Sequence, residues 1–200
     1  MLTHYKFPVI ERLNDVLPAI EGHDEFIVAV RDSYVIVNYN VSYGLETFPE
    51  INDENNLHAK IRRELRGIIF DKETGKIISR SFHKFFNIGE RPETMPDKID
   101  LSSQHVILDK LDGSFLRPVK TKDGIRWMTK MGVTDTAKMA DDFLKKNPQY
   151  NEFANWACSN DLTAIFEFTS QLNRVVISYP KTDLTLLAIR HNITGEYIQY

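Results

Sequence analysis

A lysine, an aspartate and a glycine stand close together in the segment Lys110-Leu111-Asp112-Gly113-Ser114. A strand-like run at residues 105–108 precedes them and Ser114 begins the way back, so we expect Lys110 on the turn of a hairpin. Lysine becomes a nucleophile when desolvation or neighbouring cations shift its ammonium toward the neutral amine. The segment could therefore supply a nucleophilic amine, carried on a turn that includes Asp112 and Gly113.

The Lys-x-Asp-Gly pattern is expected of enzymes that attach a nucleotide to their own lysine. It fits an ordinary hairpin equally well, because Asp-Gly turns flanked by lysine are common. Four other segments carry residues that suit the same chemistry, although each alone also fits a structural role. They contain Arg66 beside a glycine, Lys84 with Phe86, Lys130, and Glu167 followed by Arg174.

These residues gain a common chemical purpose if a nucleoside triphosphate binds near Lys110. Its phosphates would face the cations Arg66, Lys84, Lys130 and Arg174, which would stabilise charge developing on the α-phosphate and lower the pKa of Lys110. Glu167 does not suit phosphate and should accept hydrogen bonds from ribose hydroxyls. An aromatic such as Phe86 would pack on the base.

The elements that must position these residues follow from hydrophobic periodicity and turn signals. The pattern predicts an α+β fold of mostly antiparallel sheets with helices on their surfaces. Helices are predicted at residues 9–20, 58–64, 134–146 and 150–159. Strands are predicted at residues 25–31, 34–41, 65–70, 76–81, 105–108, 114–116, 162–169, 174–179, 184–191 and 197–200, with a second hairpin turning at 122–124.

Bulk composition is that of a soluble globular protein. The chain has 200 residues, of which 42% are hydrophobic and 26% charged, enough to bury a substantial core. The first residues lack the apolar core of a signal peptide, and with one cysteine, Cys158, no internal disulfide can form. A cytoplasmic location is expected. The net charge of −3 means that any polyanion must be met by local positive charge.

Six segments occur in the same order and at similar spacing in one known family. The chain resembles the amino-terminal nucleotidyltransferase domain, with its ATP-grasp-like fold, of phage-type ATP-dependent RNA ligases that repair cleaved tRNA. The resemblance covers about residues 28–200. It rests on Arg-Gly-Ile-Ile-Phe at 66–70, His-Lys-Phe-Phe-Asn at 83–87, Lys-Leu-Asp-Gly-Ser at 110–114, Phe-Glu-Phe at 166–168, Asn-Arg-Val-Val at 173–176 and Thr-Gly-Glu-Tyr-Ile at 194–198.

The resemblance implies a three-step reaction that uses ATP and Mg²⁺. Lys110 would take AMP from ATP, AMP would pass to an RNA 5′-phosphate end, and a 3′-hydroxyl would displace it to seal the strand. The matched motifs assign Asp112 and Gly113 to the nucleophile turn. They assign nucleotide binding to Arg66, Lys84, Phe86, Lys130, Glu167 and Arg174. Partners would be RNA, including tRNA, in the host cytoplasm if a phage encodes the chain.

The family pattern continues beyond Tyr200 with a motif IV acid, a motif V lysine pair and a domain that helps recognise tRNA. We therefore expect residues 1–200 to form an incomplete adenylation domain, truncated at its carboxy-terminal end. Alternatives remain open. They are a catalytically impaired fragment that binds nucleotide or RNA ends, a related DNA ligase, a GTP-using capping-type nucleotidyltransferase, and a structural protein without enzymatic activity.

Overall fold

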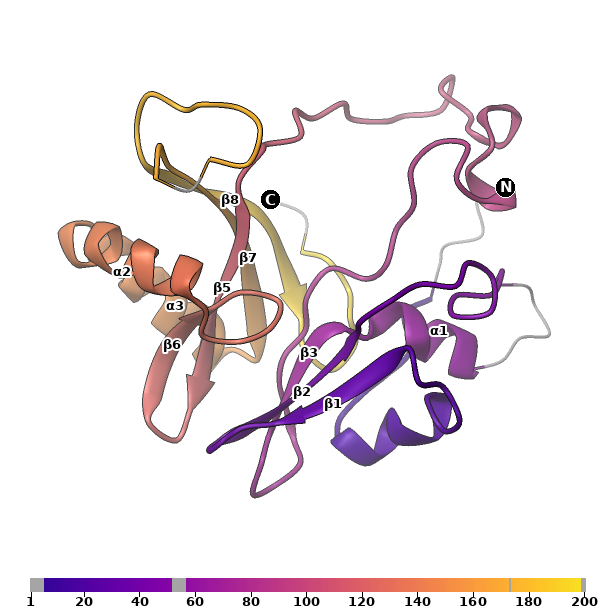
Figure 1. Cartoon of the computed structure of the whole chain (residues 1–200), viewed down its shortest axis with the longest axis horizontal. Coiled ribbons are helices and arrows are strands. Elements are labelled where there is room, and N and C mark those ends of the chain that lie inside the picture. The colour runs from indigo at the N-terminus through magenta and orange to yellow at the C-terminus, as the bar shows by residue number, and fades with distance from the viewer. Residues whose placement is uncertain (1–5, 52–56, 173, 199–200) are drawn as a thin grey trace.

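Two antiparallel sheets lie against each other, and helices cover their outer faces (Figure 1). The computed structural model describes residues 6–51, 57–172 and 174–198. The predicted α+β class, with mostly antiparallel sheets and surface helices, is confirmed. Within the described residues no helix is long and apolar enough to cross a membrane.

The first sheet has the strand order β1-β2-β3-β4. Its β1–β2 hairpin forms from the strands predicted at residues 25–31 and 34–41. Alternate side chains of these strands point to opposite faces of the sheet. Helix α1, Leu57–Glu64, packs on the outer face with the 3₁₀ turns Leu13–Asp15 and Leu17–Ala19. The strands are β1 Phe26–Val30, β2 Tyr34–Tyr39, β3 Arg66–Asp71 and β4 Ile77–Ser79.

The second sheet has the order β6-β5-β7-β8. Its outer face carries α2, Asp135–Lys146, and α3, Gln149–Ser159. Helix α2 begins as predicted, because the Thr134 side chain accepts a hydrogen bond from the amide of Ala137 and caps the first turn. The strands are β5 Ser114–Thr121, β6 Gly124–Met128, β7 Leu162–Thr169 and β8 Asp183–His191.

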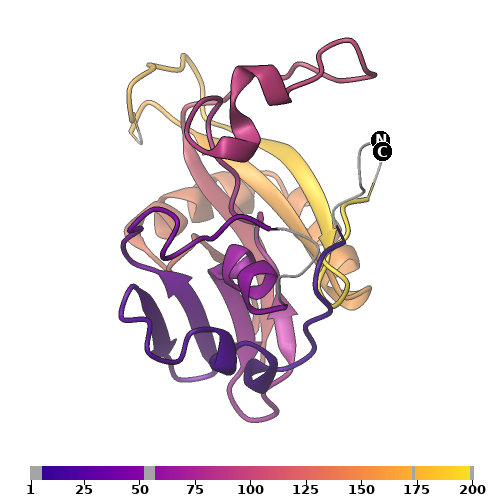
Figure 2. The same cartoon turned by 90° about the vertical axis from the view of Figure 1, so that its right-hand side faces the viewer.

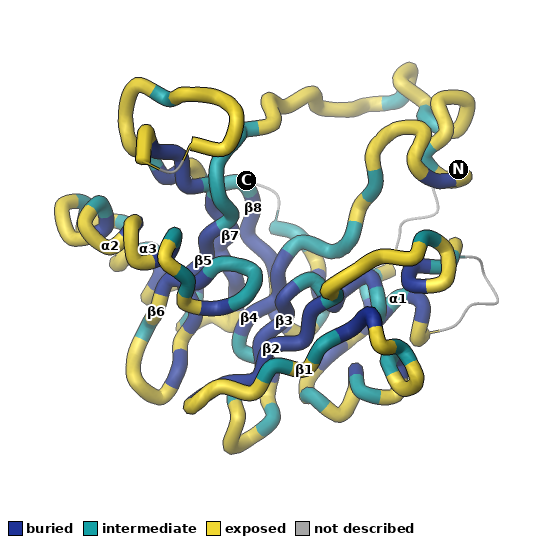
Figure 3. The backbone as a smooth tube through the Cα atoms, viewed as in Figure 1, coloured by how far each residue is buried: buried dark blue, intermediate teal, exposed yellow. Residues whose placement is uncertain are grey.

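The layer between the sheets is apolar in its lower part. Ile36 and Ile69 of the first sheet pack there against Val119 and Met128 of the second. Figure 3 shows the buried strands at the centre, with exposed segments at the upper end of the molecule. The two sheets therefore share an apolar core that fixes their separation in this part of the molecule.

A long connection joins the two sheets. Residues 80–113 leave β4, pass through the 3₁₀ turns Pro92–Thr94 and Pro96–Lys98, and return to β5 across the upper end of the molecule. Figure 2 shows the same connection from the side, with the β7–β8 loop, residues 170–182, at the same end. Lys84, Phe86 and Lys110 all lie on this connection.

A buried ion network joins α1, β8 and the segment after β4. The Glu64 carboxylate accepts hydrogen bonds from Arg80 Nε at 2.9 Å and Arg190 Nη2 at 3.0 Å, and all three side chains are fully buried. Burial raises the pKa of Glu64, but the charges of Arg190 and Arg80 outweigh it and hold the pKa below its ordinary value. The network ties the two sheets together at their sides.

Three strand predictions and one helix prediction are wrong. Residues 105–108 form no strand, because both edges of β5 are already paired with β6 and β7, and Lys110 therefore lies on an extended segment instead of a hairpin. Residues 174–179 form a loop. Tyr197 makes an isolated bridge with Arg190, and residues 199–200 lie outside the described residues. The predicted helix at 9–20 is two 3₁₀ turns, since Pro18 has no amide hydrogen to donate.

Candidate functional site

Three cations converge at the upper edge of the first sheet. The ammonium nitrogens of Lys84 and Lys130 lie 5.7 Å and 4.9 Å from the centre of the Tyr39 ring. Burial lowers the pKa of Lys130, and the charges of Arg66 and Lys84 lower it further. Burial likewise lowers the pKa of Lys84, with further lowering by Arg66 and Arg91 against the opposing effect of Glu90. We call Arg66, Lys84 and Lys130 the cation cluster.

A glycine makes this convergence possible. Gly67 has φ +81°, and a Cβ placed on it would lie 2.4 Å from the Lys130 carbonyl oxygen. Any larger residue would push the Lys130 backbone away from β3 while also being strained at that φ. The glycine beside Arg66 therefore allows a close backbone approach, and this brings Lys130 next to Arg66.

Glu167 lies on the face of β7 that points toward the first sheet. Phe166 and Phe168 point the other way and are buried under α2 and α3. The half-buried Glu167 carboxylate accepts a hydrogen bond from the Gly113 amide at 3.0 Å. Burial raises its pKa, which is lowered in part by that hydrogen bond and by the charges of Lys110 and Arg66. Glu167 thus links the lysine segment to the cation cluster.

Gly113 is pressed against the backbone of β7. A Cβ at this position would lie 2.3 Å from the Phe168 carbonyl oxygen and 2.9 Å from Thr169 Cγ2. Only glycine permits the chain to pass so close and still offer its amide to Glu167. Lys110, three residues earlier, is exposed, and its charge acts on both Asp112 and Glu167.

Asp112 holds the β7–β8 loop. Its Oδ2 accepts hydrogen bonds from the amides of Val176 and Ile177 at 2.6 Å and 2.5 Å, and its own amide donates to the Tyr179 hydroxyl at 2.9 Å. The Ile177 bond is the largest cause of the lowered pKa of Asp112, followed by the Val176 bond. These amides are the groups that a strand at 174–179 would have used for pairing. The carboxylate therefore couples the lysine segment to this loop.

The two phenylalanines of the 83–87 segment face different surroundings. Phe86 packs at the edge of the first-sheet core, with its ring 4.8 Å from Lys84 Nζ and 4.6 Å from Arg91 Cζ. Phe85 is 53% exposed, and the Arg66 guanidinium lies 4.9 Å from its ring centre. The structure therefore places Phe86 against the core and Phe85 at the surface, beside the cation cluster.

Arg174 lies on the β7–β8 loop, whereas Arg66 lies on β3, Lys84 on the long connection and Lys130 just after β6. Arg174 is exposed, and its Nε donates to the Val176 carbonyl at 3.1 Å within the same loop. The neighbouring Asn173 lies outside the described residues. Arg174 is not among the groups whose charge shifts the pKa of Lys84, Lys130 or Glu167.

Sequence reasoning missed Tyr39, whose ring lies under both lysines of the cation cluster. Tyr39 ends an alternating strand, and its position alone carried no signal of a shared role with residues 45 and 91 positions later. Tyr197 was also missed as a partner of the 83–87 segment. Its hydroxyl lies 2.9 Å from His83 Nδ1 and accepts from the His83 amide at 3.3 Å.

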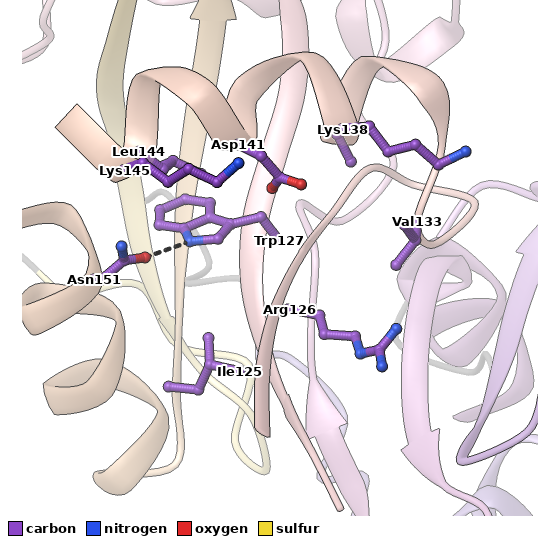
Figure 4. Close-up of a pocket in the computed structure, with 10 residues that line it drawn as sticks. Ile125, Arg126, Trp127, Val133, Lys138, Asp141, Leu144, Lys145 and Asn151 are labelled. Atoms are coloured by element: carbon purple, nitrogen blue, oxygen red, sulfur yellow. Dashed lines mark hydrogen bonds between the residues drawn. The ribbon is translucent and has the colours of Figure 1, made fainter. Parts of the chain in front are cut away.

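No protein-built metal site is evident in the described part of the chain, where no group of three or more histidines, cysteines or acids gathers. Mg²⁺ commonly keeps several waters and binds mainly through substrate phosphates. A cavity of about 340 Å³ lies elsewhere, between α2 and β6, where Trp127 Nε1 donates to Asn151 Oδ1 at 3.0 Å (Figure 4). None of the residues predicted for nucleotide chemistry lines it.

The sequence of residues 64–200 matches the family model described as RNA ligase. This match covers more than half of the chain, and the protein therefore belongs to the RNA ligase family. It is similar to a candidate RNA ligase of Thermovibrio ammonificans, with 32% identity over 187 residues that cover 93% of this chain and 46% of that protein. The chain thus spans about half the length of this curated relative.

Two further relatives come from viruses. RNA ligase 1 of bacteriophage TS2126 is 28% identical over 145 residues, covering 68% of this chain and 36% of that protein. A candidate bifunctional polynucleotide kinase/RNA ligase of Autographa californica nuclear polyhedrosis virus is 30% identical over 154 residues, which cover 67% of this chain and 22% of that protein. Among solved structures, an archaeal ATP-dependent RNA ligase aligns with a TM-score of 0.47 and 14% identity over 91% of this chain and 44% of that one.

Proposed function

We propose that this chain is the adenylylating part of an ATP-dependent RNA ligase that joins RNA ends through a lysyl-AMP intermediate on Lys110. Family membership supports the reaction class. The observation that carries the assignment of the site is the cation cluster beside Glu167 and the Lys110 segment. Two lysines share the Tyr39 ring and the charge of Arg66 acts on both, and such a gathering of like charges favours a polyanionic ligand.

In the first step the neutral amine of Lys110 attacks the α-phosphorus of ATP. A P–N bond forms, the bond from the α-phosphorus to the bridging oxygen breaks, and pyrophosphate leaves with that electron pair. The amine proton passes to solvent. Lys110 is exposed in this structure, so the nucleotide itself would complete the desolvated surroundings that favour the neutral amine.

The chain's own residues divide the work of this step. Arg66, Lys84 and Lys130 bind the phosphates and stabilise the charge that develops on them. Glu167 accepts hydrogen bonds from the ribose hydroxyls and, through the Gly113 amide, positions the segment that carries Lys110. Mg²⁺ would be bound through phosphate oxygens and water, and no step here depends on it.

The finer assignments belong to the same proposal. The substrates would be RNA with 5′-phosphate and 3′-hydroxyl ends, with cleaved tRNA as the physiological case. The cytoplasm, or the host cell's cytoplasm for a phage-encoded chain, would be the site of action. A single cysteine, which forms no internal disulfide, supports a reducing location.

A sealing assay tests this proposal. RNA carrying a 5′-phosphate and RNA already carrying a 5′-adenylate are each incubated with the chain, with ATP supplied to the first. We expect wild-type protein to seal both, Lys110→Ala to seal only the adenylated RNA, and Glu167→Ala to lose most activity on the phosphorylated RNA. Sealing of the phosphorylated RNA by Lys110→Ala would contradict the proposal.

One observation favours a second candidate, a fragment that binds nucleotide or RNA ends without turnover. Lys110 is exposed on an extended segment whose preceding apolar residues Val106, Ile107 and Leu108 are 78%, 87% and 78% exposed. This candidate predicts that nucleotide stabilises the protein against heat while neither RNA is sealed.

A further inference from the structure

Arg117 is a buried arginine on β5, the strand that follows the lysine segment. Its side chain is fully buried. In the strand it shares a face with Phe115 and Val119, and Val119 packs in the core between the two sheets. Arg117 therefore points into the space between the sheets, above the apolar layer and below the site.

Two of the three nitrogens of the Arg117 guanidinium lack a hydrogen-bond acceptor among the described residues. Its Nη2 donates to the Gly67 carbonyl oxygen, whereas Nε and Nη1 are buried without any hydrogen-bond partner in the described chain. The Phe115 ring lies 5.4 Å from Cζ. Burial lowers the pKa of Arg117 to about 9, and no acidic side chain offsets the effect. It still carries its charge at neutral pH.

The contrast with the other fully buried arginines is informative. Arg80 and Arg190 are both paired with Glu64 at 2.9 Å. A buried charge without a partner is costly, as are buried donors without acceptors. The fold thus neutralises two of its buried guanidinium groups and leaves a third, Arg117, with two donor nitrogens that have no partner among the described residues.

The position of Arg117 connects it to the candidate site. Its acceptor, Gly67, directly follows Arg66 and packs against Lys130. Its neighbour on the same face, Phe115, is paired across the sheet with Glu167. Arg117 therefore lies at the inner end of the site, behind Arg66 and Lys130.

We propose that Arg117 is a further ligand-binding residue, whose unpaired N–H groups donate to a phosphate group bound between the two sheets. This inference rests on the proposed function and deepens it. The phosphate belongs either to ATP or to the 5′-end of RNA, which offer the same oxyanion chemistry. Arg117 would meet it with a planar guanidinium already held in place by Gly67.

The test compares ligand-induced thermal stabilisation and calorimetric affinity for wild type, Arg117→Met and Arg117→Lys. The probes are ATP, inorganic pyrophosphate, adenosine, and one oligoribonucleotide with and without a 5′-phosphate. Arg126→Met, on the neighbouring strand with a half-exposed side chain, is the matched control. Pyrophosphate and adenosine separate binding of phosphate from binding of the base, and the RNA pair separates the two phosphate sources.

We expect Arg117→Met, without ligand, to unfold at the same temperature as wild type or higher, because an unpaired buried charge has been removed. Its affinity for the phosphate-bearing probe should fall at least tenfold, with adenosine binding unchanged. Arg117→Lys should recover part of the loss, and Arg126→Met should match wild type. Loss confined to ATP and pyrophosphate would assign the nucleotide phosphate, and loss confined to the 5′-phosphorylated RNA would assign the RNA end.

Unchanged affinity for every phosphate probe in Arg117→Met would overturn the inference and leave Arg117 a structural residue. If Arg117→Met does not fold, Arg117→Lys decides, because it keeps the charge but loses the planar guanidinium and should weaken phosphate binding. Stabilisation of wild type by pyrophosphate but not ATP, lost in Arg117→Met, would refute the nucleotide site while supporting this inference. Absence of stabilisation by all phosphate probes would refute both.

Discussion

At the scale of single residues, the site depends on two glycines that let backbone segments touch. Gly67 admits the backbone of Lys130, and Gly113 admits that of Phe168. Neither glycine does chemistry, yet each places a charged group that would. These contacts bring together the elements that carry Arg66, Lys110 and Glu167, the residues on which the proposed function depends.

Substitution of Gly113 by alanine tests this dependence. The added methyl would meet the Phe168 carbonyl oxygen at 2.3 Å, so the segment must shift away from β7 and break the hydrogen bond to Glu167. We expect a loss of about 2–3 kcal/mol in the free energy of unfolding, measured in urea. Gly22→Ala, which has open space around its Cβ, should cost only about 1 kcal/mol from backbone strain. Equal losses in the two variants would mean that the contact is not tight.

At the scale of elements, the Lys110 segment and the β7–β8 loop act as one unit through Asp112. The acid of the Lys-x-Asp-Gly pattern was expected to complete a turn. In the structure it accepts the amides of Val176 and Ile177, and thereby joins two motif segments 64 residues apart. The loop carries Arg174, so this contact also determines where that residue lies.

Asp112→Ala should release the loop without unfolding the protein. Hydrogen exchange at the amides of Val176 and Ile177 is expected to accelerate at least tenfold, because without the Asp112 carboxylate both N–H groups are open to solvent. Amides of the buried β7 strand should exchange as in wild type. Asp109→Ala, an exposed neighbour, provides the control, and similar acceleration in both variants would argue against the anchoring role.

His83 joins the long connection to the end of the chain through Tyr197, and it makes stability depend on pH. Burial, followed by the charge of Arg190, lowers the pKa of His83 to about 4 from 6.5. The unfolded chain therefore binds the proton first as pH falls. Stability is complete above the ordinary pKa and is lost between about pH 6.5 and pH 4, by up to about 3 kcal/mol.

Urea unfolding of wild type and His83→Gln across that range provides the measurement. We expect the difference in unfolding free energy between the two proteins to shrink as pH falls, since the variant has no imidazole to protonate. His105→Gln, at an exposed position, should follow wild type. If the free energy of unfolding changes with pH in the same way for wild type and His83→Gln, His83 titrates normally in the folded protein.

At the scale of the whole molecule, the Glu64 network ties the two sheets together at their sides, because it joins α1 and the segment after β4 to β8. Arg190 also donates to the carbonyls of Ser81 and Gly195, and Arg80 donates to that of Pro8. Removing the acid would leave two buried guanidinium groups facing each other without a counter-charge.

We therefore expect Glu64→Gln to lower the free energy of unfolding by about 3–5 kcal/mol, as for other broken buried ion pairs. Denaturant unfolding followed by circular dichroism measures this loss. Glu73→Gln, which breaks an exposed pair with Lys122, should have little effect. A small effect of both substitutions would show that the network does not hold the sheets together.

The sequence predicted the strands with alternating or buried apolar residues and the capped helix α2, because these patterns reflect local geometry. It failed at residues 105–108 and 174–179. Their apolar, β-branched composition favours strands, yet pairing depends on a free sheet edge and on amides not already bound by Asp112. It also grouped Arg174 with Arg66, Lys84 and Lys130 as a nucleotide-binding residue, and that assignment stays a prediction.

The proposed function requires that Lys110 form a covalent bond to AMP. The most direct measurement is incubation of the chain with α-labelled ATP and Mg²⁺, followed by denaturing electrophoresis and by treatment of the labelled protein with acid. We expect acid-labile label on wild type and none on Lys110→Ala or Lys110→Arg. Equal label on Lys110→Ala, or an absence of label on a wild-type chain shown to bind ATP, would contradict the proposed function.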